Sequence, residues 1–214
     1  MWRVARVWIG VGLIYATILA WHQPLRGPLG EDEVRAAFGP RFDQMQASGD
    51  PQAAALLAFF LTDDGKPFFM VNLNALPDPT ADTAGAARRH GTFMGARLLP
   101  RASYPVLSTN VIGALTNSLD ADLGPFDRLV VVRYRSRRDF LAIIATPAFR
   151  DAVDDKALSL EGWYSAPAAI GPTVSLPLSA FALLLMIGVA TTIRVQRSDR
   201  RRQDRLPFLG GRRA

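Results

Sequence analysis

Residues 126–140, FDRLVVVRYRSRRDF, decide the fold expected for this chain. The apolar and β-branched run at residues 126–135 predicts the strongest strand in the sequence. Ser136 follows it directly and is a preferred N-cap residue, with Asp139 at the third helical position where a capping box carries Glu. The stretch therefore predicts a strand that leads at once into a helix over residues 137–145.

The sequence on either side of this stretch extends the strand and the helix into an alternating pattern. The predicted elements are a strand at 67–76, an Ala-rich helix at 84–99, a strand at 104–115, a loop at 116–125, the strand and helix at 126–145, a short helix at 147–153 and a last strand at about 157–164. This β-α-β-β-α-β order is that of a ferredoxin-like α+β domain, with a four-stranded antiparallel sheet and both helices on one face.

Two further helical regions precede the first strand. Acidic residues in the first turn favour a helix over residues 31–47, which Gly39-Pro40 should break or kink. Pro51 opens a second helix at residues 51–61, and Asp63-Asp64-Gly65 closes it as a turn. Residues 22–30, HQPLRGPLG, have the composition of a linker.

Alternation along residues 67–76, PFFMVNLNAL, separates two faces of the first strand. Phe69, Val71 and Leu73 form a wholly apolar face, which we expect beneath the helices, while Met70, Asn72 and Asn74 point the other way. Apolar residues occupy both faces of the first and third strands, so the sheet face without helices also needs a cover. A second copy of the domain is the economical cover, and we expect a homodimer.

Three runs carry a family resemblance: FFMVNLNAL, then GARLLPRASYPVLSTNVIG, then FDRLVVVRYRSRRDFLAIIATPAFRDAV. Their order and spacing over about residues 50–166 resemble the domain-of-unknown-function thirteen-thirty family, in the dimeric α/β-barrel superfamily with EthD-like proteins and antibiotic-biosynthesis monooxygenases. The matching motifs are MVNL at 70–73, Ala102 to Val106, and Asp127 to Phe140, with Leu129 where Val is usual. The resemblance implies a dimeric α/β barrel and leaves the reaction open.

Two uncharged apolar segments flank this domain. Residues 174–193 contain no charge, and twenty residues at about 1.5 Å each span a bilayer core of about 30 Å. Residues 7–21 are shorter, and they fit either an uncleaved anchor or a cleaved signal peptide, of which we favour the anchor. The chain departs from the common family form by having these segments.

The charges predict a topology. Arg3 and Arg6 precede the first span, acidic residues follow it, and residues 194–214 hold eight Arg. Because basic residues stay in the cytoplasm, both termini are expected there, with the central domain outside. The excess of Arg over Lys, 23 to 2, is typical of a GC-rich bacterial genome. The predicted location is therefore a bacterial inner membrane.

This reading gives the following organisation. The segments are a cytoplasmic N-terminus at 1–6, a transmembrane helix or signal peptide at 7–21, a linker at 22–30, leading helices at 31–66, the ferredoxin-like domain at 67–166, a transmembrane helix at 172–193 and a basic cytoplasmic tail at 194–214. The central part is nearly neutral, which argues against nucleic acid as a partner. Membrane lipid, a second copy and a small molecule are the expected partners.

Composition and motifs exclude several kinds of chemistry. The sequence has no Cys, which removes disulfides and thiol catalysis, and only two His, too few and too far apart for an ordinary zinc site. No Walker loop, G-x-S-x-G or H-E-x-x-H motif occurs, so we expect no metal and no cofactor.

The candidate ligand-binding residues are Asn72, Arg133 and Tyr134. Asn72 stands in an apolar strand, where its amide could bind a ligand or satisfy buried backbone groups. Arg133 and Tyr134 point to opposite faces, and Arg133 could hold a carboxylate or instead be solvated or paired with an acid. His90 could be a general base, as in cofactor-free members of the superfamily, but is expected to be exposed.

The turn around Ser136 offers one more candidate. Arg135, Arg137 and Arg138 could cradle an anion at a helix N-terminus, and the simpler interpretation is a cap with an exposed charged turn. Taken together, the sequence predicts a membrane-anchored extracytoplasmic module that binds a small molecule or a partner protein. The alternative is a cofactor-independent monooxygenase or isomerase that acts in the barrel.

Overall fold

The computed structural model describes residues 2–112, 126–171 and 176–204. The predicted loop at 116–125, the end of the predicted strand at 104–115 and residues 205–214 of the tail lie outside these ranges. The chain forms two compact units, one of residues 22–171 and one from the two terminal segments. The central unit therefore includes the linker and the leading helices together with the sheet.

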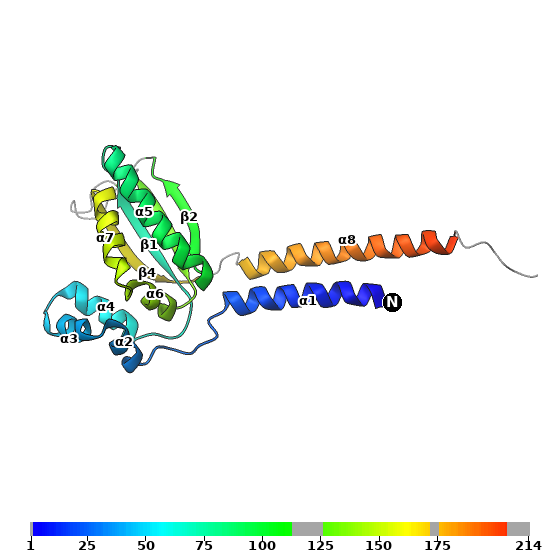
Figure 1. Cartoon of the computed structure of the whole chain (residues 1–214), viewed down its shortest axis with the longest axis horizontal. Helices are drawn as coiled ribbons and strands as arrows, with labels where there is room; N and C mark the ends of the chain where they lie inside the picture. Colours follow the sequence, from blue (N-terminus) through cyan, green and yellow to red (C-terminus); the bar gives the residue numbers. More distant parts are fainter. Residues whose placement is uncertain (1, 113–125, 172–175, 205–214) are drawn as a thin grey trace, which may run out of the picture. The chain divides into compact units, whose positions relative to one another are not determined.

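The central unit is a mixed α+β structure built on a four-stranded antiparallel sheet (Figure 1). Its strands are β1 Phe68–Ala75, β2 Tyr104–Asn110, β3 Arg128–Tyr134 and β4 Gly162–Ala169. The spatial order is β2-β3-β1-β4, which puts the two most apolar strands in the middle. In β1, Asn72 lies opposite Val130 of β3 and Ser165 of β4.

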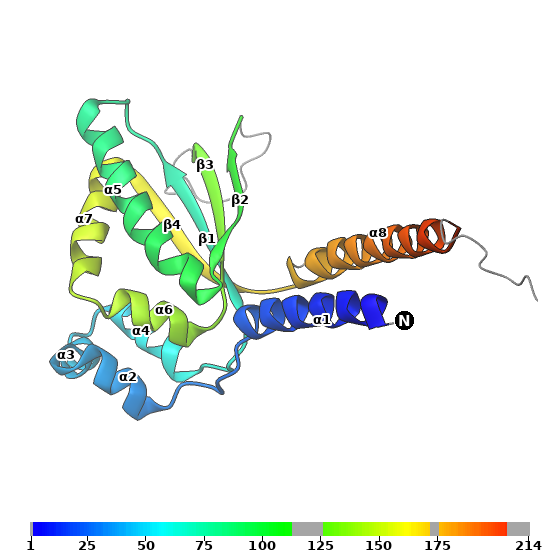
Figure 2. The same ribbon diagram turned by 45° about the vertical axis from the view of Figure 1, so that its right-hand side comes forward.

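Two long helices, α5 Ala81–Leu98 and α7 Ala148–Ser159, cover one face of this sheet, as Figure 2 shows. A 3-10 turn, η1 Leu99–Arg101, links α5 to β2. The shorter helix α6 Arg137–Ile144 begins where the sequence predicts it, and the Ser136 hydroxyl accepts a hydrogen bond from the Asp139 amide. The predicted N-cap at the end of the strongest strand is thus confirmed.

The end of the domain differs from the prediction. The helix expected at 147–153 continues to Ser159, and the last strand begins at Gly162 rather than near residue 157. The physical reason is helical spacing: Phe149, Val153 and Lys156 fall at intervals of three or four and all line the space between α7 and the sheet.

The prediction of which β1 face lies under the helices is also wrong. Met70, Asn72 and Asn74 face α5 and α7, and the apolar face of Phe69, Val71 and Leu73 is the one that no helix of the central unit covers in the described chain. Alternation separates the two faces but does not say which one the helices take. Phe68 decides it.

Phe68 is only 5% exposed and stacks on Tyr134, with ring centroids 5.1 Å apart. Tyr134 in turn meets the Phe140 ring of α6 at 4.8 Å. This aromatic cluster lies on the same face as Met70, so the strand buries that face against the helices.

The leading helices are α2 Glu31–Phe38, α3 Pro40–Ala47 and α4 Pro51–Leu61, so the predicted break at Gly39-Pro40 is confirmed. They share one core with α6. Its buried members are Leu29, Val34, Phe38, Phe42, Leu57, Phe60, Leu141 and Ile144. The linker is therefore part of the packed unit through Leu29.

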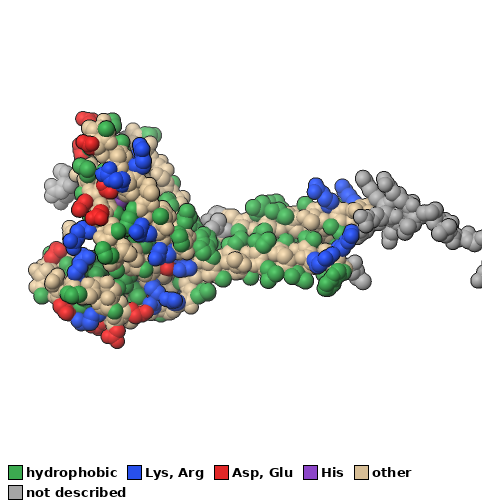
Figure 3. All heavy atoms as spheres, viewed as in Figure 1, with side chains coloured by type: hydrophobic (Ala, Val, Ile, Leu, Met, Phe, Trp, Pro, Cys, Tyr) green, Lys and Arg blue, Asp and Glu red, His purple; other side chains and the backbone are tan. Residues whose placement is uncertain are grey.

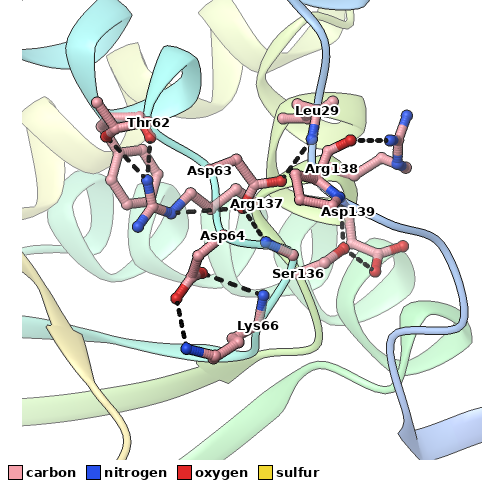
Figure 4. A network of polar contacts seen from close by, with 12 residues as sticks. Leu29, Thr62, Asp63, Asp64, Lys66, Ser136, Arg137, Arg138 and Asp139 are labelled. Atoms are coloured by element: carbon pink, nitrogen blue, oxygen red, sulfur yellow. Dashed lines mark hydrogen bonds and ion pairs between the residues drawn. The ribbon is translucent and has the colours of Figure 1, made fainter.

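A polar network ties the linker to the start of α6 (Figure 4). Asp63, whose side chain is 1% exposed, accepts from the Leu29 amide at 2.8 Å and lies 3.6 Å from the Arg137 guanidinium. Arg138 donates to the carbonyl oxygens of Gly27 and Pro28 and pairs with Glu33. The prediction of an exposed charged turn is wrong here. Arg137 and Arg138 instead interact with neighbouring backbone carbonyl oxygens and acidic side chains.

The second unit consists of α1 Trp2–His22, up to Trp21, and α8 Leu176–Asp204. Both helices are long and apolar enough to cross a membrane. They pack side by side in antiparallel order: Tyr15 meets Phe181 at 5.2 Å, and a Cβ on Gly188 would lie 3.0 Å from the Trp8 ring. Figure 3 shows apolar side chains along the pair and Lys and Arg side chains gathered at one end.

Candidate functional site

A cavity of about 580 Å³ lies between the sheet and helices α5 and α7. This volume is in the range of small-molecule sites. Its walls are mainly apolar, from Met70, Val130 and Val132 on the sheet to Met94 and Leu98 on α5. Polar groups from five different elements, β1, α5, β3, α7 and β4, converge on it, and these define the candidate site.

The cavity exists because one stripe of α5 carries only Ala and Gly. Ala87, Gly91 and Gly95 follow one another at intervals of four and all line it. A Cβ placed on Gly91 or Gly95 would meet no atom within 4 Å. The glycines therefore leave an open volume under the helix. Each also lowers the stability of the helix by about 1 kcal/mol relative to Ala.

Lys156 of α7 is the central charged group of the site. Its ammonium lies 3.4 Å from Asn72 Oδ1, 3.5 Å from Ser165 Oγ and 5.1 Å from the centre of the Trp163 ring. Burial lowers the pKa of Lys156 to about 8. Among the described residues no carboxylate lies within ion-pair distance of it, since the neighbouring Asp155 pairs with Arg89 at 2.6 Å.

Asn72 lines the cavity but its amide is already engaged. Oδ1 accepts from Ser165 Oγ at 2.8 Å, and Nδ2 donates to the carbonyl oxygens of Met70 and Val130 at 3.3 and 3.4 Å. These are the contacts of a structural amide that joins three strands. Asn72 also turns Oδ1 toward Lys156, so it positions that amine.

Asn74, two residues along the same face, is different. It is 8% exposed, and its Oδ1 is buried with no hydrogen-bond partner. A buried carbonyl oxygen without a partner costs about 1–3 kcal/mol. Asn74 also lines the cavity, so an unsatisfied acceptor lies within the cavity wall, roughly 7 Å along the strand from Asn72.

His90 of α5 is half-buried rather than exposed as predicted, and it lines the cavity. Its Nδ1 lies 2.7 Å from the carbonyl oxygen of Ala152. Because a carbonyl can only accept, Nδ1 carries the proton and the lone pair stays on Nε2. Burial lowers the pKa of His90, so the ring is neutral at pH 7 and can accept a proton.

The structure separates Arg133 from Tyr134. Tyr134 lines the cavity, is 3% exposed, and burial raises the pKa of its hydroxyl, which stays protonated. Arg133 lies on the opposite face, neither solvated nor paired with an acid. It donates to Ala102 O at 2.9 Å and to His22 O at 3.3 Å. Its role is to hold these two backbone segments together.

Three of the four main polar residues of the site were missed as site residues by the sequence prediction. Asn72 was identified, whereas Asn74, Lys156 and Ser165 were not. The signal for Lys156 was its spacing from Phe149 and Val153, which places all three on one helical face. The described residues hold no group of three or more His, Asp or Glu that could bind a metal ion.

The lowered pKa of Lys156 makes a prediction about stability. The unfolded chain has the ordinary value of about 10.5, so below pH 8 the full cost of charging a buried amine opposes folding. Between pH 8 and 10.5 this cost disappears, because the unfolded state binds the extra proton. Relative to Lys156→Met, the wild-type chain should gain up to about 3 kcal/mol of unfolding free energy over that interval.

The measurement is denaturant unfolding of the full chain in detergent at several pH values. Lys66→Met is the matched control, because Lys66 is the other lysine of the chain and is exposed. Its profile should run parallel to the wild type. Parallel profiles for Lys156→Met as well would contradict the buried amine.

No family model and no curated protein matches this chain. Among solved structures, a protein of unknown function from Rhodopseudomonas palustris, RPA0582, is similar at 23% identity and a TM-score of 0.48, over 57% of this chain and 97% of that chain. Methylated RPA0582 is similar at 20% identity and a TM-score of 0.49, over 58% and 96%. Because RPA0582 is itself of unknown function, these similarities assign no activity to this chain.

Proposed function

We propose that this chain is a membrane-anchored extracytoplasmic module that binds a small, largely apolar molecule between its sheet and helices α5 and α7. The observation that carries the proposal is the cavity of about 580 Å³ with polar groups at Asn74, Lys156 and Ser165. A preformed apolar volume with a few convergent polar groups is the usual form of a ligand site.

The binding proposal is tested by filling the cavity. Gly91→Phe places a ring in the open volume, and it should weaken binding of 2-naphthol and of 6-hydroxy-2-naphthoate at least about tenfold. The matched control is Gly85→Phe, on the same helix but outside the lining. Binding to the full chain in phosphatidylcholine nanodiscs is measured by probe fluorescence against empty discs. Equal binding by both variants, or none by the wild type, would refute the proposal.

Within this function, we propose the ferredoxin-like dimeric α/β barrel as the finer architecture. The strand order β2-β3-β1-β4, with a helix after β1 and helices after β3, supports the ferredoxin-like part. The open sheet face supports the dimer. Around Val71 it gathers Phe69, Leu73, Leu107, Leu129, Val131, Tyr164, Ala166 and Ala168.

Leu107 and Tyr164 on that face are 46% and 51% exposed. A contiguous apolar sheet face of this kind is typical of an interface, and a second copy presents an identical one. We therefore expect a dimer in which the two open faces pack together.

A charge on this face should separate the two copies. Val131→Glu places a carboxylate in the middle of the apolar surface, where burial against a partner is strongly unfavourable. Cross-linking and sedimentation of the detergent-solubilised chain should show a dimer for the wild type and a monomer for the variant. Gln52→Glu, on the exposed surface of α4, is the control and should stay dimeric. A monomeric wild type would contradict the proposal.

The finer location is a bacterial inner membrane with both termini in the cytoplasm. The basic residues Arg3 and Arg6 at the start of α1 and those at the far end of α8 support it. Alkaline phosphatase is active only outside the cytoplasm, so a fusion after Ala169 should be active and one after Asp204 inactive. The reverse pattern would overturn the orientation.

A second candidate function is a cofactor-independent monooxygenase or isomerase. The neutral imidazole of His90 favours it, since Nε2 can accept a proton from a bound carbon acid in the cavity. Binding and catalysis differ in whether the bound molecule changes. NMR of 2-naphthol and 6-hydroxy-2-naphthoate after incubation with the full chain, with and without oxygen, separates the two.

A further inference from the structure

We infer that the ligand of the cavity is an organic anion, whose acidic group pairs with Lys156 and whose far end donates a hydrogen bond to Asn74. This inference rests on the proposed binding function and names its ligand class. It follows from three independent features of the cavity: its charge, the geometry around the amine and the unsatisfied acceptor.

The charge of the lining has one sign. Its two members that are basic at neutral pH are Lys156 and Arg128, and none of the described residues that line it is Asp or Glu. Aspartates are close by, but they are engaged elsewhere: Asp155 pairs with Arg89, and Asp127 accepts from the Leu76 amide at 2.7 Å. A partly buried cation is stabilised by a paired anion, and no described residue of the lining supplies one to Lys156.

The surroundings of the amine leave room for that anion. An ammonium has three donors, and Lys156 makes two hydrogen bonds to described residues, both long, at 3.4 and 3.5 Å. The Trp163 ring holds the charge from one side. The third donor is available for a carboxylate, sulfonate or phenolate oxygen at a charge-assisted distance.

The unsatisfied Oδ1 of Asn74 defines the other end of the ligand. It is an acceptor buried in the cavity wall, and once a turn of the Asn74 side chain brings it to the cavity, its complement is a hydroxyl or N–H group. Asn72 already engages Lys156, and Asn74 lies two residues away on the same face, roughly 7 Å along the strand. The best-matched ligand is thus a mostly apolar acid that carries a donor at the opposite end, such as a hydroxyaryl acid.

The test compares three probes that differ by one group each: 6-hydroxy-2-naphthoate, 2-naphthoate and 2-naphthol. The full chain in phosphatidylcholine nanodiscs should bind 6-hydroxy-2-naphthoate tightest, at least about tenfold better than 2-naphthol. Lys156→Met should abolish the advantage of the acid over 2-naphthol. Lys66→Met is the matched lysine control and should keep it.

Asn74→Leu tests the other end. It should reduce the affinity for 6-hydroxy-2-naphthoate to that for 2-naphthoate and leave the latter unchanged. The variant removes an unsatisfied polar atom from a buried position, so the chain should remain folded without ligand. Retained preference for the hydroxylated acid would overturn the assignment of Asn74.

A pH series separates a charge pair from a general apolar contact. The charge of 2-naphthoate is constant from pH 7 to 9.5, so its affinity should be constant below pH 8 and fall toward tenfold per pH unit above it. Besides Lys156, the titratable or charged groups that line the cavity are His90 of α5 and Arg128 and Tyr134 of β3. Of these, the His90 ring is neutral throughout the series. Lys156→Met should remove the dependence.

The outcomes are distinguishable from those of the binding proposal. If 2-naphthol binds as tightly as the two acids and Gly91→Phe still blocks it, the cavity binds ligands but the anion inference is wrong. If no probe binds in a manner sensitive to Gly91→Phe, the binding function fails as well. A pH-independent affinity for 2-naphthoate in the wild type would also overturn the role of Lys156.

Discussion

Side chains alternate across a strand, and β1 therefore offers only one of its two faces to the helices. The rest of the central unit depends on this choice. Phe68 settles it, because its stack on Tyr134 and the nearby Phe140 forms the buried aromatic cluster between sheet and helices. Asn72 and Asn74 lie on the same face of β1 as Phe68, so they also face the helices. The fully apolar face is left outside, where only another apolar surface can bury it.

The cavity follows from a second local property, the small side chains of α5. A helix that packs on a sheet normally fills the space with Leu or Phe, and here Gly91 and Gly95 leave it open. The helix keeps its position through contacts with α7, where Arg89 pairs with Asp155 and His90 hydrogen-bonds to Ala152. These polar bonds add to the apolar contact between Phe93 of α5 and Phe149 of α7.

Local signals predicted most of the elements, because caps and breakers act within a few residues. Ser136, Pro51 and Gly39-Pro40 each mark a helix boundary that the structure contains. The errors arose where the decision is tertiary. Which face of β1 is buried depends on its stack with Tyr134, 66 residues later in the chain. The start of β4 depends on how far α7 packs along the sheet. The site depends both on the buried face of β1 and on the length of α7. The sequence prediction therefore found Asn72 but not Lys156 beside it.

The identity of the basic residue at position 156 matters for the chemistry. Of 25 basic residues in the chain, 23 are Arg, yet position 156 in the cavity wall carries one of the two Lys. An arginine there would remain charged at any pH and would need several acceptors for its planar fork. A lysine can place its methylene stem along apolar walls and present a single compact charge. Its pKa of about 8 also places its protonation equilibrium close to neutral pH. In the proposed complex an incoming anion, rather than a residue of the protein, neutralises this charge.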